Sequence, residues 1–496
     1  MDVQEKLRHV IEGKRQAIID LQRELTAVPA LGPQNGGEGE SKKAQVLSGW
    51  LDRLGLGPVA NYPAADPRVP SGERPNLLAR LPGTSADGTF WIMSHLDIVP
   101  PGEAHLWKTD PYTLVVRDDR LIGRGVEDNQ QGLVASVVAA AAVKELGLVP
   151  ARTVGLLFVA DEETGSDLGI QHLVATTDLF GPRDRALVPD AGAPDGSCIE
   201  VAEKSLYWLR FRIRGKQCHA STPEKGINAF AAGSNLVVRL AALAERFPAR
   251  DPLFAPPIST FTPTKKEANV PNINTIPGED VFYLDCRVLP REDLDEVLGA
   301  IRGKQCHAST PEKGINAFAA GSSLVVRLSA LSERFPARDP LFAPPVSTFT
   351  PTKKDANVPN INTIPGEDVF YLDCRVLPRE SLHDVMTAIR GICDTVQADF
   401  GVTVDIEEVQ KASSPPTSAD APLVSSLKSA IRVVYGVQGV PIGIGGGTVG
   451  AFLRKKGIPT VVWSRLEEMA HQPNEYCLLG NLMGDALVMA LLMLGD

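Results

Sequence analysis

The chain has 496 residues and a formal net charge of −10, and its apolar and charged contents are typical of globular proteins. This length allows two or three domains, and the acidic balance argues against nucleic acid or an anionic membrane as the main partner. The N-terminal segment MDVQEKLRHVIEGKRQ is charged and amphipathic and has no apolar core. No secretory signal is therefore expected, and a cytoplasmic location is predicted.

The first 200 residues are predicted to form an α/β domain. Residues 1–56 are mainly helical in pattern, and short apolar runs then alternate with helical segments. These segments are TFWIMS (89–94), a helix from Gln131 to Leu146, TVGLLFVA (153–160) and ALVPD (186–190). Short buried strands separated by helices are typical of a mainly parallel sheet. Near the C-terminus, the apolar segment 478–495 contains Asn481 and Asp485, which favours a buried core helix over a membrane span.

An internal repeat occupies the middle of the chain. Residues 213–300 align with residues 301–388 without a gap, and the tripeptide IRG stands at 213–215, 301–303 and 389–391. With its flanking strands, one unit has the predicted order β-α-β-β-α-β. Neither copy is complete, because the first lacks the closing strand and the second lacks the opening strand. We expect a two-part domain of six strands and four helices; the alternatives are one looped-out copy or a damaged, non-catalytic product.

Acidic residues and histidines follow the predicted strands. Polar groups beyond the carboxyl ends of strands are where open α/β sheets bind their ligands. The motifs are SHLDIVPPG, GRGVEDNQQG, VADEETGS and LVPDAGAP, and a fifth motif, EEMAHQPNEY, lies near the C-terminus. Their candidate residues are His95, Asp97, Asp128, Glu162, Glu163, Asp190 and His471.

Each motif also has a structural interpretation. Asp128 stands where a helix begins, so it could be an N-cap. His95 and Asp97 are two residues apart and point the same way on an extended segment, so Asp97 could accept the imidazole N–H. Glu162 and Glu163 are adjacent and would repel each other unless a cation compensates. The five motifs together indicate a metal site more strongly than any one alone.

The five motifs resemble those of the co-catalytic zinc hydrolases of the M20 family, which includes desuccinylases, acetylornithine deacetylases, carboxypeptidases and dipeptidases. The resemblance covers essentially the whole chain once one repeat copy is removed. It implies a mainly parallel-sheet α/β catalytic domain in two parts, 1–204 and 413–496. It also implies an inserted α+β lid or dimerisation domain, with its two copies at 205–300 and 301–412. A homodimer, or a monomer whose double lid mimics one, is the expected assembly.

The resemblance further implies two divalent metal ions, zinc first and cobalt or manganese as substitutes. Such a pair, about 3.5–4 Å apart, activates a water and polarises a carbonyl. A cis peptide bond is implied between Asp128 and Asn129. The implied roles are Asp128 as the ligand shared by both metals, His95 and Asp190 for one metal, Glu163 and His471 for the other, Glu162 as general base, and Asp97 orienting His95.

Candidate substrate-binding residues come from the repeat and from one glycine-rich stretch. CHASTPEKGINA resembles the lid motif whose histidine stabilises the oxyanion, which gives His219 and His307. NINTIP and DCRVLPR resemble lid positions that bind a substrate carboxylate, and GIGGGTVG resembles a substrate loop. These candidates are Asn274, Asn362, Arg287, Arg375, Gly446, Gly447 and Thr448.

The expected activity is hydrolysis of an amide bond in small N-acyl amino acids or short peptides. Asp190 stands where several deacylases of the family carry Glu, which favours dipeptidase-like or aminoacylase-like members. One alternative is a deacylase similar to succinyl-diaminopimelate desuccinylase. An alternative of another class is an inactive scaffold that results from the duplication. The expected partner is a small molecule or short peptide, with no nucleic acid and no membrane.

Overall fold

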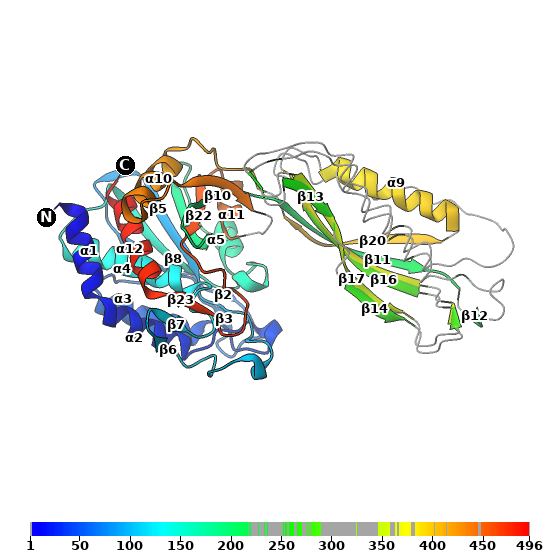
Figure 1. Cartoon of the computed structure of the whole chain (residues 1–496), viewed down its shortest axis with the longest axis horizontal. Helices are drawn as coiled ribbons and strands as arrows, with labels where there is room; N and C mark the ends of the chain where they lie inside the picture. Colours follow the sequence, from blue (N-terminus) through cyan, green and yellow to red (C-terminus); the bar gives the residue numbers. More distant parts are fainter. Residues whose placement is uncertain are drawn as a thin grey trace. The chain divides into compact units, whose positions relative to one another are not determined.

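The computed structural model describes residues 2–216 and 382–495 apart from 401, 413 and 445–447, and only parts of 217–381. These parts are 218–219, 227, 233, 236, 251, 253–254, 257–261, 265–269, 275–276, 279–288, 324, 346–357, 363–364 and 367–377. The chain divides into two compact units (Figure 1). Unit 1 comprises residues 1–201, 417–441 and 448–496, and unit 2 comprises residues 202–416 and 442–447.

Unit 1 is built on an eight-stranded sheet, as the apolar runs of the sequence predict. Its four central strands, β8, β5, β9 and β22, are parallel to one another, whereas β4 pairs antiparallel with β8 and with β1, and β10 pairs antiparallel with β22. In spatial order the strands are β1 (Ala60–Asn61), β4 (Leu77–Leu81), β8 (Arg152–Val159), β5 (Ser85–His95), β9 (Arg185–Gly192), β22 (Thr460–Ser464), β10 (Cys198–Glu203) and β21 (Val440–Ile444).

Helices lie on both faces of this sheet (Figure 1). The predicted central helix is α4, whose residues from Gln130 to Val143 are all buried, as expected for a helix that is apolar on every side. The predicted core helix near the C-terminus is α12, in which Asn481 and Asp485 are buried. The helices of unit 1 are α1 (Val3–Gly13), α2 (Arg15–Thr26), α3 (Ser41–Arg53), α4 (Gln130–Glu145), α5 (Ile170–Thr176), α10 (Pro422–Tyr435), α11 (Gly450–Lys455) and α12 (Leu479–Leu494).

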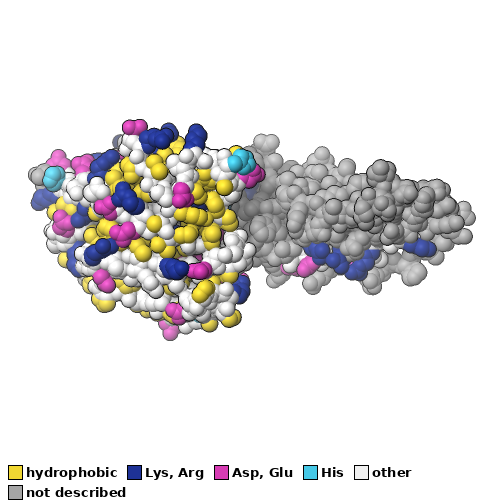
Figure 2. Space-filling view, turned by 90° about the horizontal axis from the view of Figure 1, so that it is seen from below, with side chains coloured by type: hydrophobic (Ala, Val, Ile, Leu, Met, Phe, Trp, Pro, Cys, Tyr) yellow, Lys and Arg dark blue, Asp and Glu magenta, His cyan; other side chains and the backbone are white. Residues whose placement is uncertain are grey.

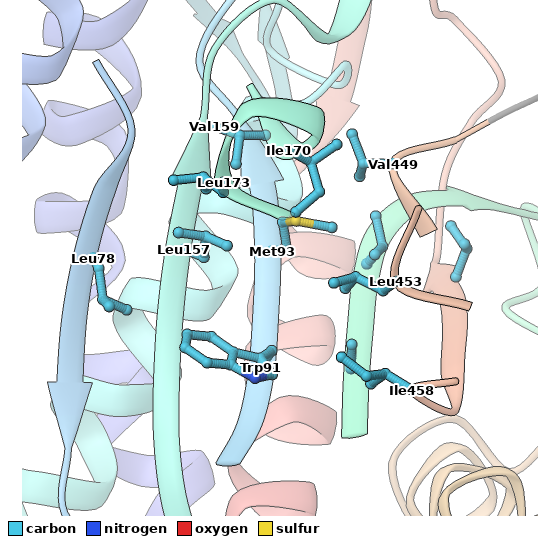
Figure 3. Packing of buried hydrophobic residues seen from close by; sticks show 13 residues of the cluster. Leu78, Trp91, Met93, Leu157, Val159, Ile170, Leu173, Val449, Leu453 and Ile458 are labelled. Atoms are coloured by element: carbon cyan, nitrogen blue, oxygen red, sulfur yellow. The ribbon is translucent and has the colours of Figure 1, made fainter. Parts of the chain in front are cut away.

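A hydrophobic cluster joins α5 and α11 to the sheet (Figure 3). Trp91 and Met93 of β5 point to this face, with Leu157 of β8, Leu173 of α5 and Leu453 of α11 packed around them. All five side chains are fully buried. This packing fixes the strands whose carboxyl ends carry the polar motifs.

The surface of unit 1 carries charges of both signs. On the face shown in Figure 2, Lys and Arg side chains are interspersed with Asp and Glu side chains and with hydrophobic ones. Among the described residues, no helix combines the length and the apolar character that a membrane crossing needs.

A small three-stranded sheet in unit 1 pairs segments that are far apart in the sequence. Its order is β23 (Tyr476–Leu478), β7 (Arg120–Ile122) and β6 (Val115–Arg117). Tyr476 lies opposite Ile122 in an antiparallel pair. The segments at the open end of this pair are the loop 123–129, here called the Asp128 loop, and the loop 465–475, here called the His471 loop.

Unit 2 contains strands from both repeat copies in one sheet. The strand order is β14 (Lys265–Asn269), β17 (Val346–Asn357), β13 (Pro257–Phe261), β19 (Glu367–Val376), β16 (Glu279–Val288), β11 (Ser205–Arg214) and β20 (Thr403–Ala412). The expectation of six strands is therefore wrong, because this sheet has seven strands in its described part. Strands β16 and β19 have the same sequence and pair in parallel, with Glu279 opposite Glu367 and Val288 opposite Val376.

Helix α9 (Leu382–Phe400) spans the end of the second repeat copy, where the order β-α-β-β-α-β places the second helix of a unit. A further small sheet consists of β15 (Thr275–Ile276), β12 (Cys218–His219) and β18 (Thr363–Ile364). The other helices predicted within the repeat lie largely outside the described residues.

Candidate metal centre

Seven of the predicted site residues come together at one end of the central sheet of unit 1. His95 is the last residue of β5, and Asp190 lies near the end of the neighbouring strand β9. Glu162 and Glu163 form a short 3-10 helix, η3 (Glu162–Thr164), directly after β8. Parallel strands end at the same edge of a sheet, which explains why these side chains meet. The remaining members are Asp97, just beyond β5, Asp128 of the Asp128 loop and His471 of the His471 loop.

Asp128 stands at the middle of this group. Its Oδ1 lies 3.0 Å from Nε2 of His95, and its Oδ2 lies 3.2 Å from Nε2 of His471. His95 Nε2 is also 3.5 Å from Oδ1 of Asp190, and His471 Nε2 is 3.2 Å from Oε2 of Glu163. Each oxygen of one carboxylate therefore faces its own pair of one histidine and one further carboxylate.

The Asp128–Asn129 peptide bond is cis, as the sequence analysis predicted. The alternative interpretation of Asp128 as an N-cap is wrong, because the N-cap of α4 is Asn129. The Asn129 side chain makes no capping bond. The Asp128 carboxylate is instead turned toward the two histidines.

The donor atoms suit divalent metal ions. Zinc bonds to nitrogen and oxygen ligands are about 2.0–2.2 Å long, so two ligands of one tetrahedral ion lie roughly 3.3–3.6 Å apart. The spacings of 3.0, 3.2 and 3.5 Å between these ligand atoms are close to that range. Oε1 of Glu163 is buried and has no hydrogen-bond partner within the described residues, as expected of an oxygen available to a cation. The residues present therefore fit a metal centre.

The carboxylates of the site repel one another. Burial raises the pKa of Glu163 to about 7, and the charge of Asp128 adds to this rise. Burial also raises the pKa of Glu162 well above its ordinary value. Hydrogen bonds to Asp128 and Glu163 raise the pKa of His471 to about 10. Without a cation the cluster therefore holds extra protons, and a divalent ion would replace them with its own charge.

Asp97 supports both His95 and the turn that follows β8. Nδ1 of His95 lies 3.0 Å from the main-chain oxygen of Asp97 and 3.4 Å from its Oδ1. The two carboxylate oxygens accept the backbone N–H groups of Glu162 and Glu163, each at 3.0 Å. The sequence suggested the contact with His95, but it did not suggest that this carboxylate also holds the two glutamates.

Three further residues border the centre and were not singled out in the sequence. Asn129 donates from Nδ2 to Asp190 Oδ1 at 2.6 Å, and its own Oδ1 accepts the N–H of His95 at 3.3 Å. Glu127 and Glu475 are buried carboxylates in the Asp128 and His471 loops. The available signal was their position inside the motifs GRGVEDNQQG and EEMAHQPNEY, next to the ligand candidates.

The remaining predicted site residues are Thr448, three residues described only by their backbone, and five residues outside the described part of the chain. Thr448 is buried and its Oγ1 accepts the N–H of Gly450 at the start of α11. His219, Arg287 and Arg375 lie on β12, β16 and β19, for which only the backbone is described. The candidates outside the described residues are His307, Asn274, Asn362, Gly446 and Gly447.

Comparison with known proteins identifies the family. The model of peptidase family M20/M25/M40 matches residues 91–494. An uncharacterized metallohydrolase of Methanococcus maripaludis is 32% identical over 477 residues, covering 94% of this chain and 95% of that protein. An acetylornithine deacetylase of Proteus mirabilis is 29% identical over 58% of this chain and 71% of its own length.

The fold agrees with this assignment. The structure of human carnosine dipeptidase 1 superimposes with a TM-score of 0.60 at 17% identity, covering 100% of this chain and 98% of that chain. The similarity supports the predicted architecture of an α/β catalytic domain with an additional lid domain. The chain belongs to peptidase family M20/M25/M40 and is a metal-dependent hydrolase.

Proposed function

We propose that this chain hydrolyses an amide bond in small N-acyl amino acids or short peptides at a centre of two divalent metal ions. The observation that carries the proposal is the position of Asp128, whose two oxygens face two separate sets of ligands. One set is completed by His95 and Asp190, and the other by Glu163 and His471. A carboxylate in this position is suited to bridge two ions.

Zinc is the proposed metal, since imidazole and carboxylate groups are common zinc ligands and three protein ligands leave a position open for water or substrate. Cobalt or manganese could substitute, because the same ligand types bind them. When bound, two such ions would lower the pKa of a shared water and polarise the substrate carbonyl.

Glu162 is the proposed general base. Its carboxylate lies within 4.8 Å of ligand atoms of His95 and Asp190, so it borders one metal set. Asp97 holds its backbone N–H, which fixes the start of the turn from which the side chain projects. Glu162 takes a proton from the attacking water and passes it to the leaving amine nitrogen as the C–N bond breaks.

The similarity to acetylornithine deacetylase supports an N-acyl amino acid as substrate. The test is a hydrolysis screen of N-acetyl and N-succinyl amino acids and dipeptides, each with added Zn²⁺, Co²⁺ or Mn²⁺, against metal-free protein. We expect metal-dependent release of a free amine from at least one class. Preference for N-succinyl substrates would support the desuccinylase-like alternative. A folded protein that binds two metals and releases no product would support the inactive scaffold.

A further inference from the structure

The loops that carry Asp128 and His471 are joined at one end. The Asp128 loop follows β7 and the His471 loop precedes β23, and these strands are neighbours. The N–H of Gly123 donates to the main-chain oxygen of Glu475 at 3.1 Å, which extends this pairing by one step. Beyond that point the loops have no regular ladder, so side chains must hold them together.

Glu475 of the His471 loop binds the Asp128 loop through hydrogen bonds to both of its carboxylate oxygens. Its Oε2 accepts the N–H of Gly125 at 3.0 Å and Nη1 of Arg124 at 2.7 Å. Its Oε1 accepts the N–H groups of Glu127 at 2.9 Å and Asp128 at 3.1 Å. The Glu475 side chain has no exposed surface, so this single carboxylate satisfies four donors in a fixed geometry.

Glu127 of the Asp128 loop makes the reverse connection. Its Oε1 accepts the N–H of Glu467 at 2.5 Å, and its Oε2 accepts the N–H of Met469. Glu468 lies between these donors with φ at 61°, a left-handed conformation that L-residues rarely adopt. Backbone N–H groups on both sides of such a residue form a concave anion site, which the Glu127 carboxylate fills.

The His471 side chain receives little support from packing. It is 57% exposed, whereas the side chain of His95 is 1% exposed. His471 itself has φ at 63°, so its own backbone also lies in the left-handed region. The position of its imidazole therefore depends on how firmly the loop backbone is held from inside.

We propose that Glu127 and Glu475 are positioning residues that set the distance between Asp128 and His471. Each carboxylate belongs to one loop and binds backbone N–H groups of the other. This reciprocal clamp keeps His471 beside the outer oxygen of Asp128, and so it controls binding of the metal shared by Asp128, Glu163 and His471. The inference rests on the proposed two-metal function.

The two carboxylates are expected to act differently. Within the described part of the chain, the Glu127 carboxylate accepts hydrogen bonds only from positions 467 and 469 of the His471 loop. Glu127→Gln should therefore weaken the metal held by His471 and leave the other metal unchanged. Glu475 holds the N–H of Asp128, the ligand shared by both metals, so Glu475→Gln should weaken both. Changing a residue that supports a metal ligand typically lowers metal affinity by about 10–100-fold.

The experiment measures zinc stoichiometry and both dissociation constants by titration against a competing chelator, with elemental analysis of the dialysed proteins. His471→Ala identifies which of the two equivalents belongs to the His471 set. The matched control is Asp184→Asn, since Asp184 is a buried carboxylate that accepts three N–H donors from Thr89, Trp91 and Gly181. Thermal unfolding of each metal-free protein shows which variants remain folded.

We expect Glu127→Gln to weaken binding of only one zinc ion, the one that His471→Ala fails to bind. Asp184→Asn should leave both zinc dissociation constants unchanged. Adding Glu127→Gln to His471→Ala should then have no further effect on metal binding. Two normal equivalents in folded Glu127→Gln, or equal weakening of both, would overturn the clamp while leaving the two-metal function intact. A wild-type protein with a single equivalent would contradict the two-metal function and the clamp together.

Discussion

The two histidines of the candidate metal centre are held in different ways. His95 ends a strand inside a parallel sheet, and its side chain is enclosed by Asp97, Asp128 and Asp190. His471 lies in a long loop, is more than half exposed and has a left-handed backbone conformation. A sheet edge positions a ligand as a consequence of core packing, whereas a loop ligand needs polar groups dedicated to that loop.

This difference shows which interactions hold each histidine in position. The strands next to His95 are fixed by the buried cluster around Trp91 and Met93, which also stabilises the fold as a whole (Figure 3). The His471 loop is fixed by carboxylates that bind its backbone. Functional residues on loops are commonly positioned in this manner by a rigid scaffold.

The largest effect is expected for Glu162, the proposed general base, and not for either histidine. Glu162→Gln should lower kcat by about 10²–10⁴-fold, because it removes proton transfer while keeping the shape of the side chain. Both metal equivalents should remain, since Glu162 is not assigned as a ligand. Steady-state kinetics and zinc analysis of the same sample test this, and loss of a metal would show that Glu162 is a ligand.

The second prediction compares the histidines directly in metal-free protein. His95→Ala should lower the free energy of unfolding by about 3–5 kcal/mol, because it leaves buried carboxylates without their partner. His471→Ala should change it by less than about 1 kcal/mol, because the pairs made by this exposed side chain are screened by water. Urea unfolding with chelator present measures both values. Equal losses would contradict the difference between sheet and loop ligands.

Asp97 contacts His95 of one proposed ligand set and Glu163 of the other. Metal binding by the two sets is therefore not expected to be fully independent. Asp97→Asn keeps only one good side-chain acceptor for the N–H groups of Glu162 and Glu163, and it removes the carboxylate charge 3.4 Å from Nδ1 of His95. Both metal equivalents should be bound about 10–100-fold more weakly. The chelator titration described above provides the measurement, and weakening of one equivalent alone would mean that the halves are separate.

The smallest effect concerns the start of the His471 loop. Asp485 of α12 accepts the N–H of Arg465, together with hydroxyl groups of Ser464 and Tyr435 and the amide of Gln131. Burial raises the pKa of Asp485 to about 6 from its ordinary 3.8, although these donors oppose the rise. The folded state therefore holds the proton more tightly than the unfolded state.

The contribution of Asp485 to stability is fully present below about pH 4 and is lost as the pH rises through about 6. The free energy of unfolding of the wild type relative to Asp485→Asn should therefore fall over this window, by roughly 1–3 kcal/mol, since a shift of about two pKa units corresponds to at most about 3 kcal/mol. Urea unfolding of both metal-free proteins at several pH values tests the sign. A difference that rises with pH would contradict it.

The sequence was sufficient to predict the ligands that follow apolar strands. TFWIMS and TVGLLFVA are recognisable as buried strands, so the polar residues after them could be placed at a common sheet edge. Asp128 and His471 were candidates from their own motifs, and the family resemblance implied their roles as ligands. All of the proposed ligands lie together in the structure, although their roles in metal binding stay a prediction.

The clamp could not be predicted in the same way. Glu475 and Glu127 are 348 positions apart in the sequence, and they meet because β7 and β23 pair. Strands of three residues are too short for a periodic pattern to reveal them. Buried acidic residues in loops also resemble ordinary surface charges until their partners are known.

The repeat shows a second limit of sequence-based prediction. The β-forming run DVFYLDCRV occurs in both copies, at 280–288 and 368–376, and it lies in a strand in each. Their pairing with each other was not predicted. Two strands of identical sequence have the same edge preferences, so the pattern cannot specify which copy takes which place in the sheet.

The central role of Asp128 is tested most directly by X-ray diffraction from zinc-soaked crystals at wavelengths on both sides of the zinc absorption edge. We expect two anomalous peaks about 3.5–4 Å apart, one on each side of Asp128. One peak should lie beside His95 and Asp190, and the other beside Glu163 and His471. A single peak in fully loaded crystals, or two peaks that share no ligand, would contradict the central role of Asp128.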